Sequence, residues 1–124
     1  KLEWMRDERK KIAEKYMEAF SGKINFISEL SDNRSAWHLF VIKVANRDDL
    51  HQELIKRGIS TSVHFIPIHK HIYYKNRYSF IDDDYPIANT IYEQSLSLPI
   101  YPGLSGNEIE YIIKHVLNHA ESHN

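Results

Sequence analysis

The chain has 124 residues, the size of one ordinary domain and enough to bury about two-thirds of its unfolded surface around one core. Its 16 Lys and Arg residues nearly balance its 17 Asp and Glu residues, so it lacks the basic field that binds nucleic acid or anionic lipid. It has no cysteine, which excludes disulfides, zinc–thiolate sites and thiol nucleophiles. No apolar run approaches the roughly 20 residues that span a bilayer. We therefore expect a soluble, cytoplasmic protein that binds neither nucleic acid nor membrane.

The N-terminal residues predict a helix. The sequence starts with Lys1 rather than methionine and enters a helical pattern at once, so we expect a piece of a longer chain. Apolar side chains at helical spacing extend this helix over residues 2–20, and Ser21-Gly22 ends it. Residues 24–30 follow as an edge strand.

Residues 36–44 give the clearest strand prediction, because apolar side chains occupy both faces, as in a central strand covered on two sides. Asn46 is placed to cap a following helix, and Gly58 is placed to end it. The buried stripe of this helix is expected to consist of Leu50, Leu54 and Ile55.

Alternation of apolar and polar residues predicts a further strand over residues 59–66. His64 falls on its polar face beside Ser60 and Ser62, and Pro67 ends the strand just beyond it. A polar strand face that meets a bend is a reasonable wall for a ligand cleft. The alternative is an ordinary exposed face.

Residues 69–80 are rich in aromatic and basic side chains and have weak periodicity, which favours an irregular helix or a surface loop. The acidic run at 82–84 and the early Pro86 then indicate the start of a helix. Ile87 and Ile91 lie on the apolar stripe of that helix.

A short strand at 96–98 and a C-terminal helix complete the pattern. Ser105 and Glu108 have the spacing of a capping box that opens this helix. The order of helices and strands, without an internal repeat, predicts an α+β fold: a small, mostly antiparallel sheet packed with helices. We expect one domain over residues 1–124.

The histidines in the middle of the chain raise the question of a metal site. His64, His69 and His71, with the acidic run at 82–84 nearby, offer imidazole and carboxylate ligands. The alternative, which the weak pattern favours, is a surface segment with hydrogen-bonded or solvated imidazoles. We expect no metal site.

Other histidines have simpler interpretations. His115 and His119 lie one helical turn apart but opposite the apolar stripe of the last helix, so we expect a solvated face. His38 shares a mostly apolar strand face, which indicates a buried histidine satisfied by backbone groups.

No motif of a complete enzyme is present. The sequence lacks Gly-x-Ser-x-Gly, and its four glycines do not group into a phosphate-binding loop.

The segment Val63-His64-Phe65-Ile66-Pro67-Ile68-His69 resembles the Val-His-Tyr-Ile-Pro-x-His segment of the DegT/DnrJ/EryC1/StrS family, the pyridoxal-phosphate-dependent nucleotide-sugar aminotransferases. Further segments match this family in the same order: Trp37-His38-Leu39-Phe40-Val41-Ile42, Arg57-Gly58-Ile59, Tyr73-Tyr74 and Leu96-Ser97-Leu98-Pro99-Ile100-Tyr101-Pro102-Gly103-Leu104-Ser105.

The resemblance implies the C-terminal small domain of such an enzyme, with the fold of fold-type-I transferases. A preceding N-terminal domain would carry the Schiff-base lysine, so no catalytic residue is assigned in this chain. The full-length enzyme would use pyridoxal 5'-phosphate to transfer an amino group, usually from glutamate, to a nucleotide-linked keto-sugar in polysaccharide or glycan biosynthesis. It would be a homodimer, and this piece alone would bind no cofactor and be inactive.

The resemblance also implies a substrate site. His64 is the best candidate for a substrate contact, with Phe65, Ile66 and Pro67 as the wall and His69 as a further candidate. Phe65 stands where tyrosine is common, so a hydroxyl contact is lost there. The residues of this motif resemble those of family members that act on UDP-linked 4-keto sugars more than those of members that act on GDP-linked sugars.

Two expectations remain beside this one. The chain is alternatively a free-standing ligand-binding or protein-binding module of the same fold without catalysis. A domain separated from its partner would also expose the covered surface, so we expect self-association through an aromatic face consisting of Tyr73, Tyr74, Tyr78 and Phe80.

Overall fold

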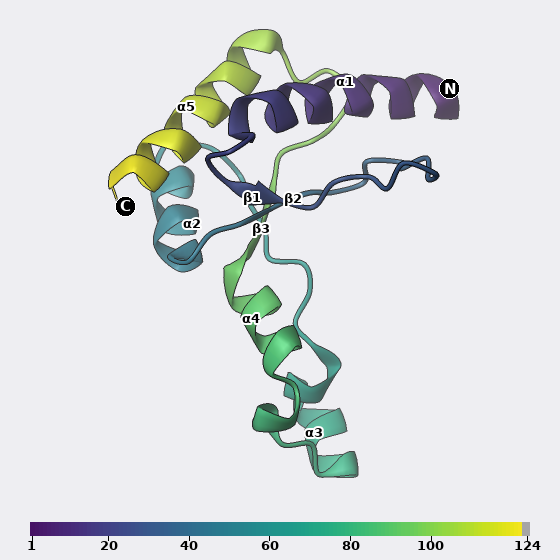
Figure 1. The fold of residues 1–124 in the computed structure, drawn as a ribbon, viewed down its shortest axis with the longest axis vertical. Coiled ribbons are helices and arrows are strands. Elements are labelled where there is room, and N and C mark those ends of the chain that lie inside the picture. Colours follow the sequence, from purple (N-terminus) through teal and green to yellow (C-terminus); the bar gives the residue numbers. More distant parts are fainter. Residues whose placement is uncertain (123–124) are drawn as a thin grey trace.

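The computed structural model describes residues 1–122. Helices pack around a small sheet at one end of the molecule, and a long projection leaves that end and returns to it (Figure 1). In chain order the elements are α1 (Leu2–Phe20), β1 (Asn25–Phe26), β2 (Phe40–Lys43), α2 (Arg47–Lys56), the 3-10 turn η1 (Ile68–Lys70), α3 (Ile72–Tyr78), the 3-10 turn η2 (Asp82–Asp84), α4 (Pro86–Gln94), β3 (Ser95–Leu98) and α5 (Gly106–Ser122).

The three strands form one antiparallel sheet with the order β1-β2-β3, so β2 is central. Phe40 of β2 lies opposite Leu98 of β3, and Ile42 lies opposite Leu96. Since alternate residues of a strand face the same side, these four side chains share one face, and all are buried. This small antiparallel sheet packed with helices confirms the expected α+β fold.

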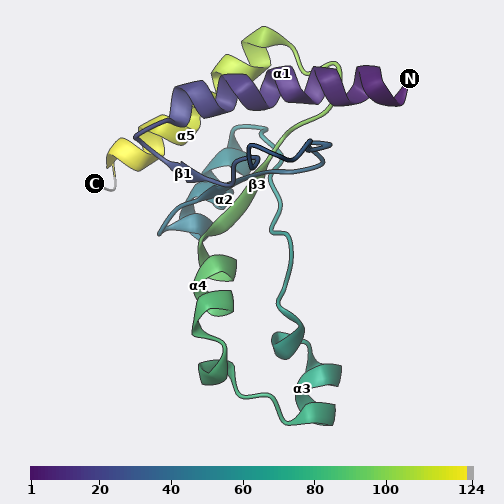
Figure 2. The ribbon, with the colours of Figure 1, turned by 45° about the vertical axis from the view of Figure 1, so that its right-hand side comes forward.

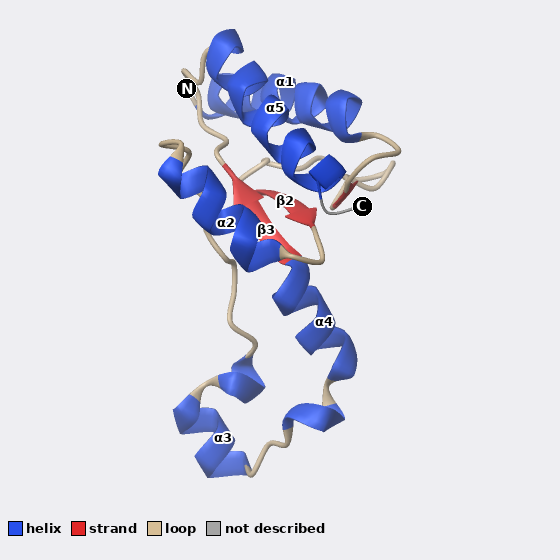
Figure 3. Ribbon diagram, turned by 90° about the vertical axis from the view of Figure 1, so that its left-hand side faces the viewer, coloured by secondary structure: helices blue, strands red, loops and turns tan. Residues whose placement is uncertain are grey.

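Helices α1 and α5 pack against each other over the apolar face of the sheet, and α2 lies against α5 and β3 (Figure 3). Phe40 is the centre of the core, because its ring contacts those of Tyr16, Phe20, Phe26 and Trp37 at centroid distances of 4.9 to 6.4 Å. The other helices complete the core with Leu50, Leu54, Ile109, Ile112 and Val116. We call this part of the molecule, residues 1–64 and 95–122, the body.

Residues 65–94 form the projection, which we call the arm. Figure 2 shows it descending from the sheet as an extended segment, turning through α3 and returning along α4 into β3. His69 is its only buried residue, and neither α3 nor α4 has one. The arm therefore lacks a hydrophobic core of its own.

Several helix predictions are confirmed at their ends. The last helix opens with the expected capping box: the Ser105 amide donates to the Glu108 carboxylate at 2.8 Å, and the Glu108 amide donates to Ser105 Oγ at 3.3 Å. The hydrogen bonds from Ser105 lower the pKa of the Glu108 carboxyl. Gly58, just beyond α2, has φ +76°, which glycine adopts without strain.

The predicted strand over residues 59–66 is wrong, because only Ser62 pairs with the sheet, through an isolated bridge to Ser97. In that register Pro99 would lie opposite Ser60, and proline has no N–H to donate to a ladder. The predicted alternation of buried and exposed side chains is nevertheless present over residues 59–62: Ile59 and Thr61 are buried, while Ser60 and Ser62 are exposed.

The predicted strand over 36–44 is shorter than expected, and so is the one over 24–30, since the observed strands cover Phe40–Lys43 and Asn25–Phe26. Trp37 has φ +47°, in the left-handed region, which interrupts the extended backbone before β2 begins. The Trp37 side chain enters the core. Within β2, Val41 and Lys43 are only half-buried, so the second face of the sheet is less covered than predicted.

The apolar stripes of two helices are less buried than their patterns predict. Ile55 of α2 is exposed, and so are Ile87 and Ile91 of α4. Periodicity identifies an apolar face, but it does not say whether this chain supplies the surface that covers it.

Within residues 1–122, no helix combines the length and the apolar character needed to cross a membrane.

Candidate functional site

Residues 59–64 run beside the open edge of β3 and are held there by contacts with the body. Thr61 is buried, and its hydroxyl lies 2.6 Å from Nδ1 of His51 on α2. Ser62 exchanges two backbone hydrogen bonds with Ser97 of β3, at 2.8 and 3.2 Å. These contacts fix the backbone that leads to the next residues of the predicted site.

His64 lies directly after this bridge, and its ring also contacts β3. Its Nδ1 is 2.9 Å from the hydroxyl of Ser97. Ser97 alternates with Leu96 and Leu98 along the strand, so its side chain is on the face turned away from α1. The imidazole is half-buried, and no residue in 1–122 pairs with its Nε2 by a hydrogen bond. His64 is thus anchored through one nitrogen and leaves the other for a ligand.

A shallow hollow of about 170 Å³ opens beside this pair. Its polar groups are imidazoles and serine hydroxyls, and no Lys, Arg, Asp or Glu is among the described residues that line it. Imidazole and hydroxyl groups both donate and accept hydrogen bonds, so the hollow offers a polar lining without a fixed charge. The lining residues are His38, Leu39, Ser60, Ser62, His64, Ser97, Leu98, Pro99 and Ile100.

The predicted wall residues follow His64 into the arm. Phe65 is 72% exposed, and its ring meets the His64 ring edge-on at 4.8 Å. Ile66 is also exposed, and Pro67 is half-buried. None of these three residues lines the hollow, and their role as a wall of the substrate site stays a prediction.

His69 is placed differently from His64. It is buried inside the arm, where its ring stacks on Tyr85 at 4.5 Å. Its Nε2 donates to the Asn89 side-chain oxygen at 2.8 Å, and the Asn89 amide donates to the Asp82 carbonyl at 2.7 Å. This chain of contacts joins η1 to α4 across the arm. His69 does not line the hollow, and its role toward a substrate stays a prediction.

His38 was expected to be a buried histidine, and this is wrong. The left-handed backbone at Trp37 turns that side chain into the core and leaves His38 exposed. His38 instead lines the hollow beside His64. The sequence pattern also did not single out Ser97 within Leu-Ser-Leu-Pro, because a serine in a strand carries no chemical signature by itself.

The solvated face expected at His115 and His119 is also wrong. His119 is buried, with Nδ1 2.8 Å from the Glu53 carboxylate of α2, and this hydrogen bond lowers the pKa of Glu53. His115 is half-buried and accepts a hydrogen bond from Arg57 at 2.9 Å. Burial, followed by the nearby Arg57, lowers the pKa of His115. Both histidines join α5 to α2. Helix α2 packs along the side of α5 that carries these histidines, which lies outside the apolar stripe of α5.

No group of three or more His, Cys, Asp or Glu side chains within residues 1–122 lies close enough to hold a metal ion together. Of the histidines that raised the question, His71 is exposed and lies 3.2 Å from the Ile66 carbonyl. Asp82 is instead engaged by Lys70 and Lys75.

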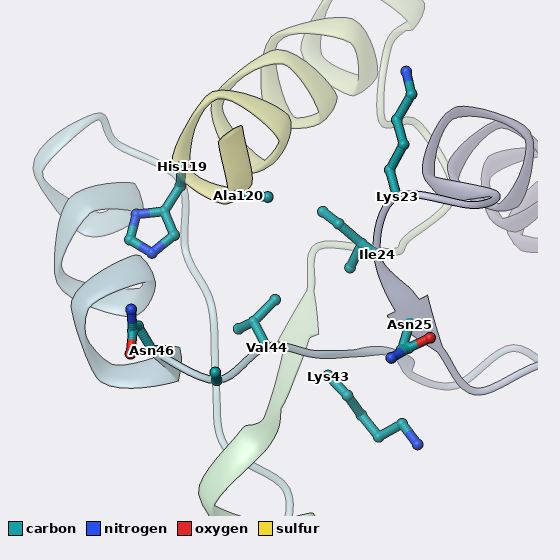
Figure 4. A pocket seen from close by; sticks show the side chains of 9 residues that line it. Lys23, Ile24, Asn25, Lys43, Val44, Asn46, His119 and Ala120 are labelled. Atoms are coloured by element: carbon teal, nitrogen blue, oxygen red, sulfur yellow. The ribbon is translucent and has the colours of Figure 1, made fainter. Parts of the chain in front are cut away.

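A second cavity, of about 180 Å³, lies between the β1–β2 end of the sheet and the end of α5 (Figure 4). Ile24, Val44 and Ala120 form its apolar part. The side chains of Lys23 and Lys43 extend in opposite directions at its rim, so their ammonium groups do not converge on one ligand.

Comparison with known proteins identifies an aminotransferase fold. The chain belongs to the DegT/DnrJ/EryC1/StrS aminotransferase family, which it matches over residues 1–117. This confirms the resemblance drawn from the sequence.

Two relatives and one solved structure illustrate the match. The spore coat polysaccharide biosynthesis protein SpsC of Bacillus subtilis is 35% identical over 125 residues, covering 94% of this chain and 32% of SpsC. The dTDP-3-amino-3,6-dideoxy-alpha-D-galactopyranose transaminase of Aneurinibacillus thermoaerophilus is 31% identical, with the same two coverages. The structure of S. venezuelae DesV in complex with a ketimine intermediate is 30% identical and has a TM-score of 0.90, covering 96% of this chain and 33% of DesV. The chain thus spans about a third of the length of the relatives it matches.

The family uses pyridoxal phosphate, and a solved relative, the putative sugar aminotransferase Spr1654 of Streptococcus pneumoniae, has PLP and PMP forms, so the hollow can be tested against that group. The cofactor needs a lysine as imine partner and a carboxylate at its pyridine nitrogen. Neither residue type lines the hollow around His64 within the described chain. The residues present there therefore do not fit the cofactor.

Proposed function

We propose that this chain is the C-terminal domain of an aminotransferase that moves an amino group from an amino acid, glutamate in our prediction, to a keto group on a nucleotide-linked sugar. The observation that carries the proposal is the family match over residues 1–117 together with coverage of about a third of each relative. One of these relatives is a transaminase named for a dTDP-linked amino sugar, and another is named for polysaccharide biosynthesis. The preference for UDP-linked sugars stays a prediction.

The proposal divides the work between two parts of the enzyme. When bound, pyridoxal phosphate supplies the carrier for the amino group and the electron sink, and a preceding domain holds it. This chain supplies one side of the substrate cleft. His64 offers Nε2 to a substrate oxygen, while Phe65, Ile66 and Pro67 shield that contact from water. A water-excluding wall strengthens a hydrogen bond by lowering the local dielectric.

We also propose that the rest of the enzyme covers the arm. The arm exposes Ile72, Tyr73, Tyr78 and Ile87, each more than half exposed. Apolar surface of this extent is uncommon on a monomer and marks a contact with another surface. The homodimer, the cytoplasmic location and the self-association of this piece through its aromatic face stay predictions beside this one.

Assay of the longer protein tests the proposal. It is expected to bind pyridoxal phosphate and to aminate a nucleotide-linked keto-sugar with glutamate. His64→Ala is expected to raise KM between about twofold and tenfold, because a hydrogen bond to an uncharged oxygen is worth about 0.5–1.5 kcal/mol, and by more where that oxygen is charged. His115→Ala is the matched control, since it removes an imidazole outside the hollow. Unchanged kinetics in His64→Ala would remove this residue from the substrate site.

The 124-residue chain alone tests whether the cofactor site lies outside it and the substrate contact lies within it. Reconstitution with pyridoxal phosphate should leave no cofactor absorbance after dialysis, because the imine-forming lysine is expected in the preceding domain. Cofactor absorbance that survives borohydride reduction would contradict this. Titration with nucleotide sugars should shift the signals around His64, whereas a free-standing module with another site would show shifts elsewhere or none.

A further inference from the structure

The Ser97 hydroxyl is buried beside the candidate substrate site, and its only hydrogen-bond partner within residues 1–122 is Nδ1 of His64, at 2.9 Å. A buried hydroxyl that has no acceptor for its proton is unfavourable. Nδ1 of His64 is the acceptor in reach, so the serine donates and the imidazole nitrogen accepts. The neutral ring then carries its proton on Nε2, because only one nitrogen of a neutral imidazole is protonated.

The backbone around this pair limits how far it can move. Ser97 is held within β3 by pairing with Val41 on one side and with Ser62 on the other, the latter through hydrogen bonds of 2.8 and 3.2 Å. His64 follows Ser62 by two residues. The donor and the acceptor therefore sit on backbone segments that are bonded to each other, which sets the orientation of the ring as well as its protonated nitrogen.

We propose that Ser97 is a positioning residue that holds His64 in the Nε2–H tautomer and turns that N–H away from β3, as a donor to an oxygen of the substrate. The proposal rests on the proposed function for the identity of the ligand, a nucleotide-linked sugar. It goes further in assigning a direction to the hydrogen bond: His64 donates, and the substrate group it meets is a hydroxyl, carbonyl or phosphate oxygen rather than an N–H.

The tautomer is measurable without activity. In the 124-residue chain labelled with ¹⁵N-histidine, two-bond ¹H–¹⁵N spectra above the imidazole titration range should show His64 with its proton on Nε2. Free neutral histidine itself favours Nε2–H but also populates Nδ1–H, so Ser97→Ala should relax His64 from a single tautomer toward that mixture, with Nδ1–H becoming detectable. Ser62→Ala is the matched control: it removes a serine hydroxyl from the same hollow and keeps the backbone bridge, so the His64 signals should keep the Nε2–H pattern.

A wild-type His64 protonated on Nδ1 would overturn the proposal, whether or not the Ser97 variant folds. So would a Ser97→Ala protein that keeps the Nε2–H tautomer undiminished. Titration with UDP-sugars or dTDP-sugars in the same spectra separates this inference from the proposed function. An Nε2–H tautomer with no shift on titration would uphold the action of Ser97 and overturn the substrate contact.

Discussion

The body and the arm of this molecule use the same types of residue to different ends. In the body, isoleucine, leucine and aromatic side chains from helices and strands converge on Phe40 and are removed from water. In the arm, equally apolar side chains such as Ile72 and Tyr73 are mostly exposed, and the buried residue is a histidine. The body is stabilised by hydrophobic burial, whereas the arm depends on a few polar contacts, on ring contacts among its partly exposed aromatic side chains and on its attachment at both ends.

The attachment of α4 to the body shows how the two regions are joined. Arg47 is buried at the start of α2, and its guanidinium donates to the Ser95 carbonyl at 3.1 Å. The same group lies 5.4 Å from the ring centroid of Tyr92, near the end of α4. One cation therefore links α2, α4 and the start of β3, and the arm leaves the body from a fixed base.

The largest predicted effect is in the body. Phe40→Ala should lower the free energy of unfolding by about 3–5 kcal/mol, because it leaves a cavity among the packed rings. Phe65→Ala, at an exposed position, should change it by no more than about 0.5 kcal/mol. Urea denaturation of both variants measures the difference. Similar losses in the two would mean that the region around Phe65 is packed as tightly as the core.

A smaller and more local effect is predicted for the arm. Asn89→Ala removes the acceptor of His69 and the donor to the Asp82 carbonyl, and leaving such groups unpaired costs about 1–3 kcal/mol. Segments with few buried apolar side chains open at lower free energy than a core, so we expect the loss to appear as faster hydrogen exchange in α3 and α4, with little change in global unfolding. Asn76→Ala, at an exposed position of α3, is the control. A global loss of stability would show that arm and body unfold together.

The helix over residues 2–20 was predicted well, because its periodicity depends on burial against this chain's own core. The strands of the body were predicted less well, since those over 24–30 and 36–44 are shorter than expected and the one over 59–66 is a single bridge. In the arm, the stripe with Ile87 and Ile91 has no covering surface within the described chain, so the same reasoning overestimated burial. Periodicity identifies the apolar face of a helix, but it does not identify the surface that covers that face.

The candidate site was predictable only in part. His64 stood out because it lies on the polar side of an alternating segment before a proline. Ser97 and His38 come to the same hollow through the bridge at Ser62 and the left-handed backbone at Trp37. Neither of these features follows from local pattern, because one is a contact between distant residues and the other is a positive φ at a non-glycine residue.

Of the two predicted N-caps, Ser105 makes the expected hydrogen bonds with Glu108, whereas Asn46 precedes α2 without a side-chain hydrogen bond to it. The capping box at Ser105 gives a third prediction. Ser105→Ala should destabilise the body by about 1 kcal/mol, since it leaves the Glu108 amide without its side-chain acceptor. Ser105→Thr should restore most of the loss, because threonine keeps the hydroxyl. Thermal denaturation of the pair measures this. No change in Ser105→Ala would mean that water caps α5 equally well.

The smallest predicted effect is the loss of stability of the arm in acid, which depends on Asp82. The hydrogen bond from Lys70, 3.2 Å away, lowers the pKa of the Asp82 carboxyl below its ordinary value. A carboxyl whose pKa is lower in the folded arm contributes stability above the unfolded pKa of about 4 and loses it as pH falls through the folded pKa. The protection of the arm against hydrogen exchange, measured relative to the intrinsic exchange rate at each pH, should therefore fall below about pH 4, and Asp82→Asn should flatten this dependence.

Asp83→Asn is the control for that measurement, since Asp83 lies in the same 3-10 turn and is exposed. Added salt should reduce the contribution of Asp82, because the pair with Lys70 is partly exposed and is screened. In the body, Glu53 has a pKa lowered by His119, so its contribution should fade over a similar acidic range. If Asp82→Asn left the acid response of the arm unchanged, the Lys70 contact would not hold the arm, and the bond between His69 and Asn89 would remain as its main internal support.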